Sequence, residues 1–142
     1  MATDTSLGFI YMGRRGGSFI PETRLKLKFK DSEALHKGDL VNNESGLVDL
    51  AATGDTAIVG IVLENKTGVA NTTEIEVMSD PDAIYSVYDP NARVFGATLD
   101  IAGATGAMTV AATSNADLIV VGGFLASERT LVMINIAKHA LN

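Results

Sequence analysis

The stretch that decides the fold is KGDLVNNESGLVDLAATGDTAIVGIVLEN, residues 37–65. Two short apolar runs, 39–41 and 47–51, flank the sequence Asn-Asn-Glu-Ser-Gly, which predicts a β-hairpin because Asn and Gly tolerate left-handed backbone. A second turn, Thr-Gly-Asp, leads into residues 57–63, AIVGIVL. This run carries no polar residue and is rich in β-branched side chains, which predicts a central strand buried on both faces. Gly60 in its middle suits a bulge or the close approach of a neighbouring strand.

Further strand-like runs lie on both sides of this stretch. Residues 24–30, RLKLKFK, alternate between cationic and apolar side chains, which is typical of an edge strand with a Lys-rich solvent face. Residues 118–125 and 129–136 are longer apolar runs that predict an antiparallel hairpin. No stretch shows convincing helical periodicity. The sequence therefore predicts an all-β fold, a single compact antiparallel β-barrel or β-sandwich over residues 24–142 with an extended N-terminal arm over residues 1–23.

The composition is that of a globular domain with a substantial core. Of the 142 residues, 46% are hydrophobic and 20% are charged, which excludes a disordered chain. No apolar run approaches the ~20 residues that span a bilayer, and no signal sequence is evident, so no membrane partner is expected. The chain has no Cys, so disulfides, thiolate catalysis and Cys-based zinc sites are excluded. The predicted core consists of Val41, Ile58, Ile61, Leu63, Ile75, Val77, Ile119, Val121, Leu131 and Ile134.

Charge is distributed unevenly along the chain. Residues 1–40 carry seven Lys and Arg against five Asp and Glu, whereas residues 41–142 carry four against twelve. One interpretation is a basic N-terminal segment that contacts an acidic partner, such as a neighbouring copy of the chain. The other is that the imbalance serves solubility alone. Nucleic acid is not an expected partner, because one Arg pair without interleaved aromatic residues is a weak electrostatic footprint on an acidic chain.

The candidate interface residues lie in the predicted arm and at its end. The sequence Gly-Arg-Arg-Gly-Gly-Ser at 13–18 lacks the spacing of a phosphate-binding loop. It predicts either a mobile loop or an arm that becomes ordered when its Arg side chains pair with carboxylates on a partner. The hypothesis for an interface with a partner or a neighbouring subunit is Arg14, Arg15, Phe19 and Arg24.

The sequence contains no recognisable catalytic constellation. His36 and His139 belong to no metal-binding or general-base motif. Asp80, Asp82 and Asp89 lie near turns, but their spacing misses that of a calcium loop, and turn formation explains them without a metal. The expectation is no catalytic, cofactor-binding or metal residue, no cofactor, and no enzymatic activity. A carboxylate pair that meets only in the folded chain stays open as an alternative.

A series of turn and core patterns runs through roughly residues 35–139. These patterns are residues 37–41, 51–55 leading to 59–63, 83–88, 96–101 with Gly103 and Gly106, and 129–139. Their order resembles that of the capsid decoration proteins, or cement proteins, of tailed bacteriophages, and the individual patterns are ones that unrelated β-barrels share. The resemblance implies a non-enzymatic virion protein on the outer surface of the capsid, which stabilises the shell by bridging neighbouring major capsid protein subunits. It also implies a homotrimer.

Two alternatives belong to other functional classes. The first is a virion appendage or fibre-base β-domain that binds a host glycan or protein. The second is a β-barrel enzyme or ligand carrier whose site is assembled only in the fold. A defined homotrimer without ligand would favour the capsid role, and a monomer with one deep polar pocket would favour the enzyme or carrier.

Overall fold

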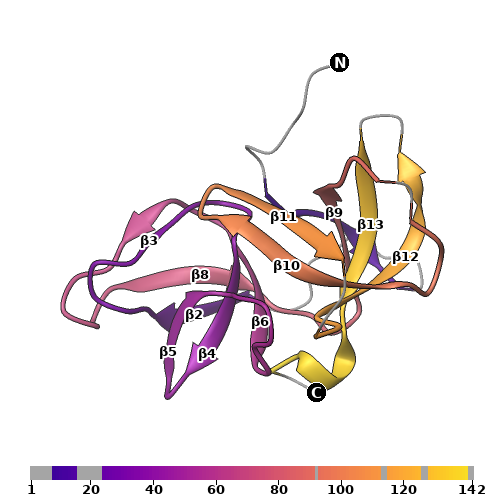
Figure 1. The fold of residues 1–142 in the computed structure, drawn as a ribbon. Coiled ribbons are helices and arrows are strands. Elements are labelled where there is room, and N and C mark those ends of the chain that lie inside the picture. The colour runs from indigo at the N-terminus through magenta and orange to yellow at the C-terminus, as the bar shows by residue number, and fades with distance from the viewer. Residues whose placement is uncertain (1–7, 16–23, 92, 113–114, 126–127, 141–142) are drawn as a thin grey trace.

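Two antiparallel sheets make up most of the computed structural model, which describes residues 8–15, 24–91, 93–112, 115–125 and 128–140 (Figure 1). The first sheet has six strands, in the order β1 (Ile10–Arg14), β9 (Ala83–Tyr88), β13 (Arg129–Ile134), β12 (Leu118–Leu125), β10 (Thr98–Ala104) and β11 (Ala107–Ala112). The second has five, in the order β2 (Arg24–Lys28), β8 (Glu74–Met78), β6 (Ile58–Val62), β4 (Leu40–Glu44) and β5 (Leu47–Leu50).

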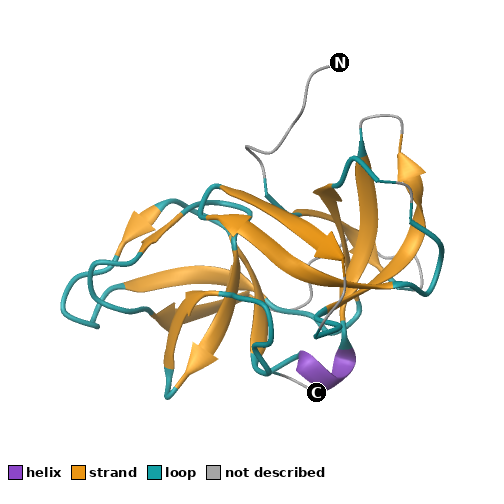
Figure 2. Cartoon of the chain, viewed as in Figure 1, coloured by secondary structure: helices purple, strands orange, loops and turns teal. Residues whose placement is uncertain are grey.

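The remaining elements are small. Two-residue strands β3 (Ala34–Leu35) and β7 (Lys66–Thr67) pair with each other, and a 3-10 helix, η1 (Ile136–Lys138), follows the last strand (Figure 2). None of the helical structure in the described residues is long and apolar enough to cross a membrane. The all-β prediction is confirmed, and of its two forms the sandwich fits, since the sheets do not close into a barrel.

The stretch at 37–65 forms β4, β5 and β6. The β4–β5 hairpin turns at Ser45 and Gly46, which have φ of 56° and 88°, so the turn is shorter than the predicted one and the strand continues to Glu44. β6 lies between β8 and β4, and all five of its residues are buried, as predicted. A Cβ on Gly60 would come within 1.9 Å of the carbonyl oxygen of Met78 in β8, so the predicted close approach is also confirmed.

Two hydrophobic cores use opposite faces of the five-stranded sheet. The larger core joins the two sheets, and its largest buried side chains include Phe9, Leu40, Ile58, Met78, Tyr85, Leu99, Met108 and Leu118. The smaller core consists of Phe29, Leu35, Val41, Val48, Val59, Val62, Ile75 and Val77. Because the five-stranded sheet is covered on both faces, its central strand needs apolar side chains at every position.

The predicted core is correct for β4, β6 and β8, but in the β12–β13 hairpin it is correct for Ile134 alone. The hairpin forms as predicted, with Ile119 opposite Met133. Its buried side chains are those of Leu118, Val120, Val132 and Ile134. The predicted Ile119, Val121 and Leu131 are only partly buried. Since side chains alternate across a strand, an offset of one residue moves a set to the other face, and an apolar run does not reveal which set is inside.

Part of the predicted N-terminal arm is a strand of the sheet. Ile10–Arg14 forms β1 and pairs with β9, and the preceding Phe9 is 1% exposed. The rings of Phe9 and Tyr11 both pack edge-on against the buried Tyr85, at centroid distances of 6.3 and 6.5 Å. Burial, aided by nearby Asp80, raises the pKa of the Tyr85 hydroxyl, which therefore stays protonated. Residues 1–7 and 16–23 of the predicted arm lie outside the described residues.

Candidate interaction surface

Arg14 and Arg15, two of the predicted interface residues, pair with carboxylates of their own chain. Arg14 donates from Nε to Oδ2 of Asp80 and from Nη2 to Oδ2 of Asp82, the latter at 3.3 Å. Arg15 donates from Nη2 to Oδ1 of Asp82 at 2.7 Å, and its side chain is 72% exposed. Both carboxylates belong to the turn before β9, so the ion pairs fasten the end of β1 to that turn. Contacts of these Arg residues with another subunit stay a prediction.

The other two predicted interface residues do not join this cluster. Arg24 begins β2, in the other sheet, and its Nη1 lies 3.2 Å from Oε1 of Glu76 on the adjacent β8. Phe19 lies outside the described residues. β2 is an edge strand whose Arg24, Lys26 and Lys28 are exposed, which confirms the prediction for residues 24–28. The four residues therefore do not make up one site in the described part of the chain.

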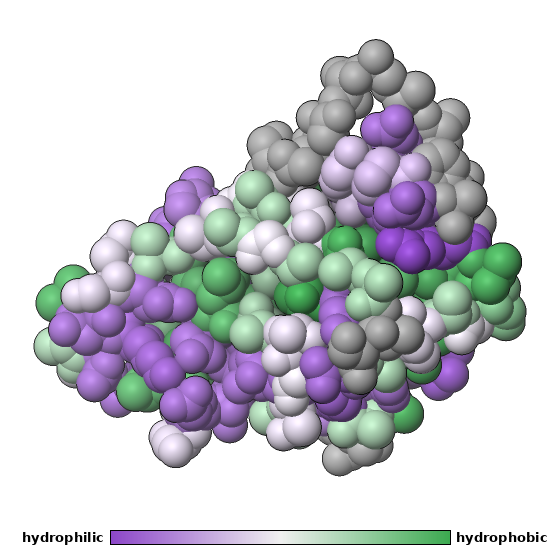
Figure 3. Space-filling model, viewed as in Figure 1, coloured by the Kyte–Doolittle hydropathy of each residue, from purple (hydrophilic) through white to green (hydrophobic). Residues whose placement is uncertain are grey.

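The outer face of the six-stranded sheet, which is the face turned away from the larger core, is unusually apolar. It presents partly buried Ile84 from β9, Ile119 and Val121 from β12, and Met133 from β13. A sheet with one solvated face normally carries polar residues there. In the space-filling view, green surface reaches the right-hand edge beside purple surface, whereas the left-hand end is mostly purple (Figure 3). Contiguous apolar surface of this kind is typical of contact surfaces in proteins.

This outer face contains a hollow of about 620 Å³ with a projecting rim. Ile84, Ile119, Val121 and Met133 line it, together with Arg15, Pro81, Phe95, Ile134 and Ile136. Phe95 is 80% exposed and Ile136 is 48% exposed. Val94, next to Phe95 in the connection between β9 and β10, is 74% exposed. Large apolar side chains are thus exposed to solvent beside an apolar hollow. We call the residues that line this hollow, together with Val94, the outer apolar face.

A second hollow, of about 550 Å³, lies beside β1 and contains the exposed His36. Nδ1 of His36 is 2.9 Å from Oγ1 of Thr105, and the Thr105 hydroxyl lies between two acceptors, the Asp39 carboxylate and the Ala34 carbonyl. Asp39 is fully buried and also accepts from the amides of His36 and Gly106, both at 2.8 Å. A nucleophilic hydroxyl would have to face the hollow with a base taking its proton. This arrangement instead fastens the tip of the β10–β11 hairpin to the segment before β4.

The carboxylates considered for calcium are engaged by cations or turns. Asp80 and Asp82 pair with Arg14 and Arg15, and fully buried Asp89 accepts from Nε of Arg93 at 2.8 Å. Asp80 and Asp89 also accept from backbone amides two residues ahead, which is the turn geometry predicted for them. Within the described ranges, no group of three or more His, Cys, Asp or Glu side chains is arranged to hold a metal ion.

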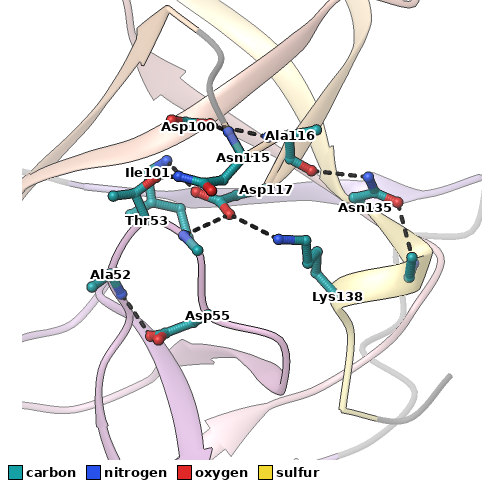
Figure 4. A network of polar contacts seen from close by, with 12 residues as sticks. Ala52, Thr53, Asp55, Asp100, Ile101, Asn115, Ala116, Asp117, Asn135 and Lys138 are labelled. Carbon is teal, nitrogen blue, oxygen red and sulfur yellow. Dashed lines mark hydrogen bonds and ion pairs between the residues drawn. The ribbon is translucent and has the colours of Figure 1, made fainter.

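A polar network connects the two sheets next to the C-terminal helix (Figure 4). The carboxylate of Asp117 is fully buried and accepts from the amides of Gly54, at 3.0 Å, and Ile101, at 3.1 Å. Its Oδ1 is also 3.7 Å from Nζ of Lys138. Gly54 belongs to the turn before β6 and Ile101 to β10, so this carboxylate holds the five-stranded sheet to the six-stranded sheet. The Asp117 carboxylate therefore has a structural role.

His139 closes the C-terminal end of the described chain against β6. It forms a bridge with Ile58, and the amide of Ala140 donates to the Ile58 carbonyl at 2.8 Å. The His139 side chain belongs to a residue that is 3% exposed. Burial lowers the pKa of its imidazole, and the nearby Asp80 carboxylate opposes this effect. The imidazole is therefore suited to the neutral form in the folded protein.

The architecture has a counterpart among solved structures. The chain is similar to the head fiber gp8.5 N base in bacteriophage phi29. The TM-score is 0.50 and the sequence identity 12%, and the match covers 82% of this chain and 98% of that chain. At this identity the likeness shows a shared fold. No family model matches the chain, and no curated protein matches it.

Of the residues that line the hollow of the outer apolar face, sequence reasoning names only Arg15 as an interface residue. It assigns Ile119 and Val121 to the core, since they belong to a run that is apolar at successive positions. Val94 and Phe95 lie in a connection, where no strand pattern draws attention to them. The sequence does carry one signal, which is an excess of apolar residues. The runs 118–121 and 131–134 are apolar on both faces, yet only one face of each strand can point toward the larger core.

Proposed function

We propose that this chain is a non-enzymatic structural protein of a bacteriophage virion. It decorates the outer surface of the capsid as a homotrimer and stabilises the shell by bridging neighbouring major capsid protein subunits. The observation that carries the proposal is the fold likeness to a head fiber N base, because the match extends over 98% of that chain. The protein whose fold is shared is thus part of a phage head.

The described surface supports a role in assembly. The outer apolar face offers exposed Phe95, Val94 and Ile136 for contact with another protein. Beside the hollow at β1, His36 contacts the Thr105 hydroxyl, and the buried Asp39 carboxylate accepts hydrogen bonds that hold the fold. Exposed apolar side chains, together with polar groups that already have hydrogen-bond partners, favour binding over catalysis.

A second candidate is the base domain of a virion appendage that binds a host glycan or protein. The protein with the shared fold favours this candidate, since that chain is the N base of a head fiber. The two functions differ in their mechanical effect on the head. A protein that bridges capsid subunits stabilises the shell, because separating the subunits then breaks additional contacts. A fibre base can attach without that effect.

The test uses heads of the phage that encodes this chain, stripped of it and then incubated with the purified protein. We expect the protein to co-sediment with the heads and to raise the temperature at which they rupture. Co-sedimentation without a change in rupture temperature would favour the fibre base. Absence of co-sedimentation would contradict both.

The predicted role of the arginines can be measured in the same assay. Arg15→Ala should weaken attachment, and the loss should shrink as salt rises, because screening removes the ionic contribution from both proteins. Lys28→Ala removes an exposed cation of the other sheet and is the matched control. Equal binding by all three proteins would exclude Arg15 from the interface.

A further inference from the structure

The outer apolar face carries a projection and a hollow side by side. Phe95 projects with 80% of its surface exposed, and Val94 beside it is 74% exposed. The hollow of about 620 Å³ next to them has apolar walls that include Ile119 and Met133. A side chain the size of Phe that stays in water loses the favourable free energy of burying its apolar surface. One chain thus displays both halves of a complementary apolar contact.

Charge indicates which partner fits this face. Of the described residues that line the hollow, Arg15 alone is charged, and it is already paired with Asp82. A strongly charged partner would find a single counter-charge there, and that charge is shared with Asp82. A second copy of this chain has a net charge of −6, so like-charged copies repel each other over most of their surfaces. The outer apolar face lets two copies meet with little of that charge at the contact.

We infer that the partner on the outer apolar face is a second copy of this chain, with Phe95 of one copy seated in the hollow of the next. The inference rests on the proposed function in taking the chain to act in several copies, and it assigns the surface through which they join. Repeated around an axis, a contact between two different patches closes into a ring such as a trimer. Direct contacts with the shell then use other surfaces, and Arg15, which lines the hollow, would affect attachment through the contact between copies.

The first experiment measures self-association of the full chain by sedimentation equilibrium over a range of concentrations. We expect the wild type to associate and Phe95→Asp to dissociate at least about a hundredfold more readily, because the contact would bury an unpaired carboxylate. Val69→Asp is the matched control, since Val69 is also exposed, at 64%, but lies in the connection between β7 and β8. It should associate like the wild type. Thermal unfolding of each variant verifies that its fold is intact.

The second experiment identifies the contacting residues. The chain has no Cys, so a single introduced thiol reports on one position only. A tagged Phe95→Cys protein is mixed with an untagged Met133→Cys protein, and a short bismaleimide is added. We expect a cross-linked species that contains both proteins, because Phe95 of one copy lies against Met133 of another. Tagged Val69→Cys mixed with Met133→Cys should give no such species.

The outcomes separate this inference from the proposed function. A wild type that stays monomeric at every concentration, or a Phe95→Asp variant that associates as well as the wild type, would overturn the inference. If that monomer still co-sediments with stripped heads, the virion role stands and the capsid becomes the partner of this face. A chain that associates through Phe95 but never binds heads would support the inference while contradicting the function.

Discussion

Arg129, in the last strand, donates a hydrogen bond of 2.7 Å from Nη2 to the carbonyl oxygen of Gly8, which lies 121 residues earlier in the chain. The same guanidinium donates to the hydroxyl and the carbonyl of Ser86 in β9, both at 3.0 Å. Arg129 is 6% exposed, so these acceptors take the place of water around a buried cation. The beginning of β1 is therefore held by β13 and β9, and it belongs to the folded domain.

Deletion of residues 1–20 should destabilise the domain, although the sequence alone suggests that an arm could be removed without harm. The deletion removes β1, the buried Phe9 and the Gly8 acceptor of Arg129. Losing a buried Phe costs about 1.5–3 kcal/mol, and an unsatisfied donor on Arg129 costs about 1–3 kcal/mol more. Deletion of residues 1–6 is the control. Urea unfolding of both truncations is the measurement, and an unchanged midpoint for the longer one would contradict the role of β1.

Gly60→Ala should cost about 3 kcal/mol or more, at the upper end of overpacking effects, because the new Cβ would lie 1.9 Å from the backbone carbonyl oxygen of Met78. Backbone in the middle of a sheet cannot move aside as a side chain can. Gly46→Ala is the control: no atom of the described residues lies within 4 Å of its added Cβ, and only its φ of +88° is unfavourable, at about 1–2 kcal/mol. Denaturant unfolding compares them. Equal losses would show that β6 and β8 can separate locally.

Asp117→Asn should destabilise the protein by about 2–3 kcal/mol, since it replaces a buried charged acceptor by an amide whose NH₂ group faces the donors. The carboxylate now serves Gly54, Ile101 and Lys138. Asp55→Asn, in the same region, is the matched control. Within the described part of the chain, Asp55 accepts from the Ala52 amide alone at a partly exposed position, so its loss should be under about 1 kcal/mol. Unfolding midpoints that show a larger loss of stability for Asp55→Asn than for Asp117→Asn would contradict this prediction.

Acid should weaken the fold partly through His139. Burial lowers the pKa of His139 in the folded chain below its ordinary value of 6.5. At a pH between the lowered pKa of the folded chain and the ordinary value of 6.5, the unfolded chain binds more protons on His139 than the folded chain does. The contribution of His139 to the free energy of unfolding is therefore highest above pH 6.5 and falls as the pH drops below it. His139→Gln should flatten that part of the stability profile. His36→Gln, at the exposed histidine, is the control, and identical profiles for all three proteins would exclude His139 as the source.

The sequence predicted much of the local structure correctly because that structure depends on neighbouring residues. The β4–β5 hairpin needs turn residues at Ser45 and Gly46, and β6 needs apolar side chains throughout. The hairpin turn, strand β6 and the cationic face of β2 each depend on one continuous stretch of residues. The candidate site was harder to predict. Arg14 pairs with Asp80, 66 positions away, and no local pattern encodes that partner.

By itself, the sequence determined the all-β class, the strand at 58–62 and the pairing of the last two strands, because side-chain size, turn chemistry and alternation act over a few residues. Only the tertiary structure decided which face of β12 and β13 is inside, and that decision created the outer apolar face. An apolar run satisfies either orientation equally well, so the choice is made by what the rest of the chain brings against it. Here the five-stranded sheet covers Val120 and Val132 and leaves Ile119 and Met133 on the opposite side.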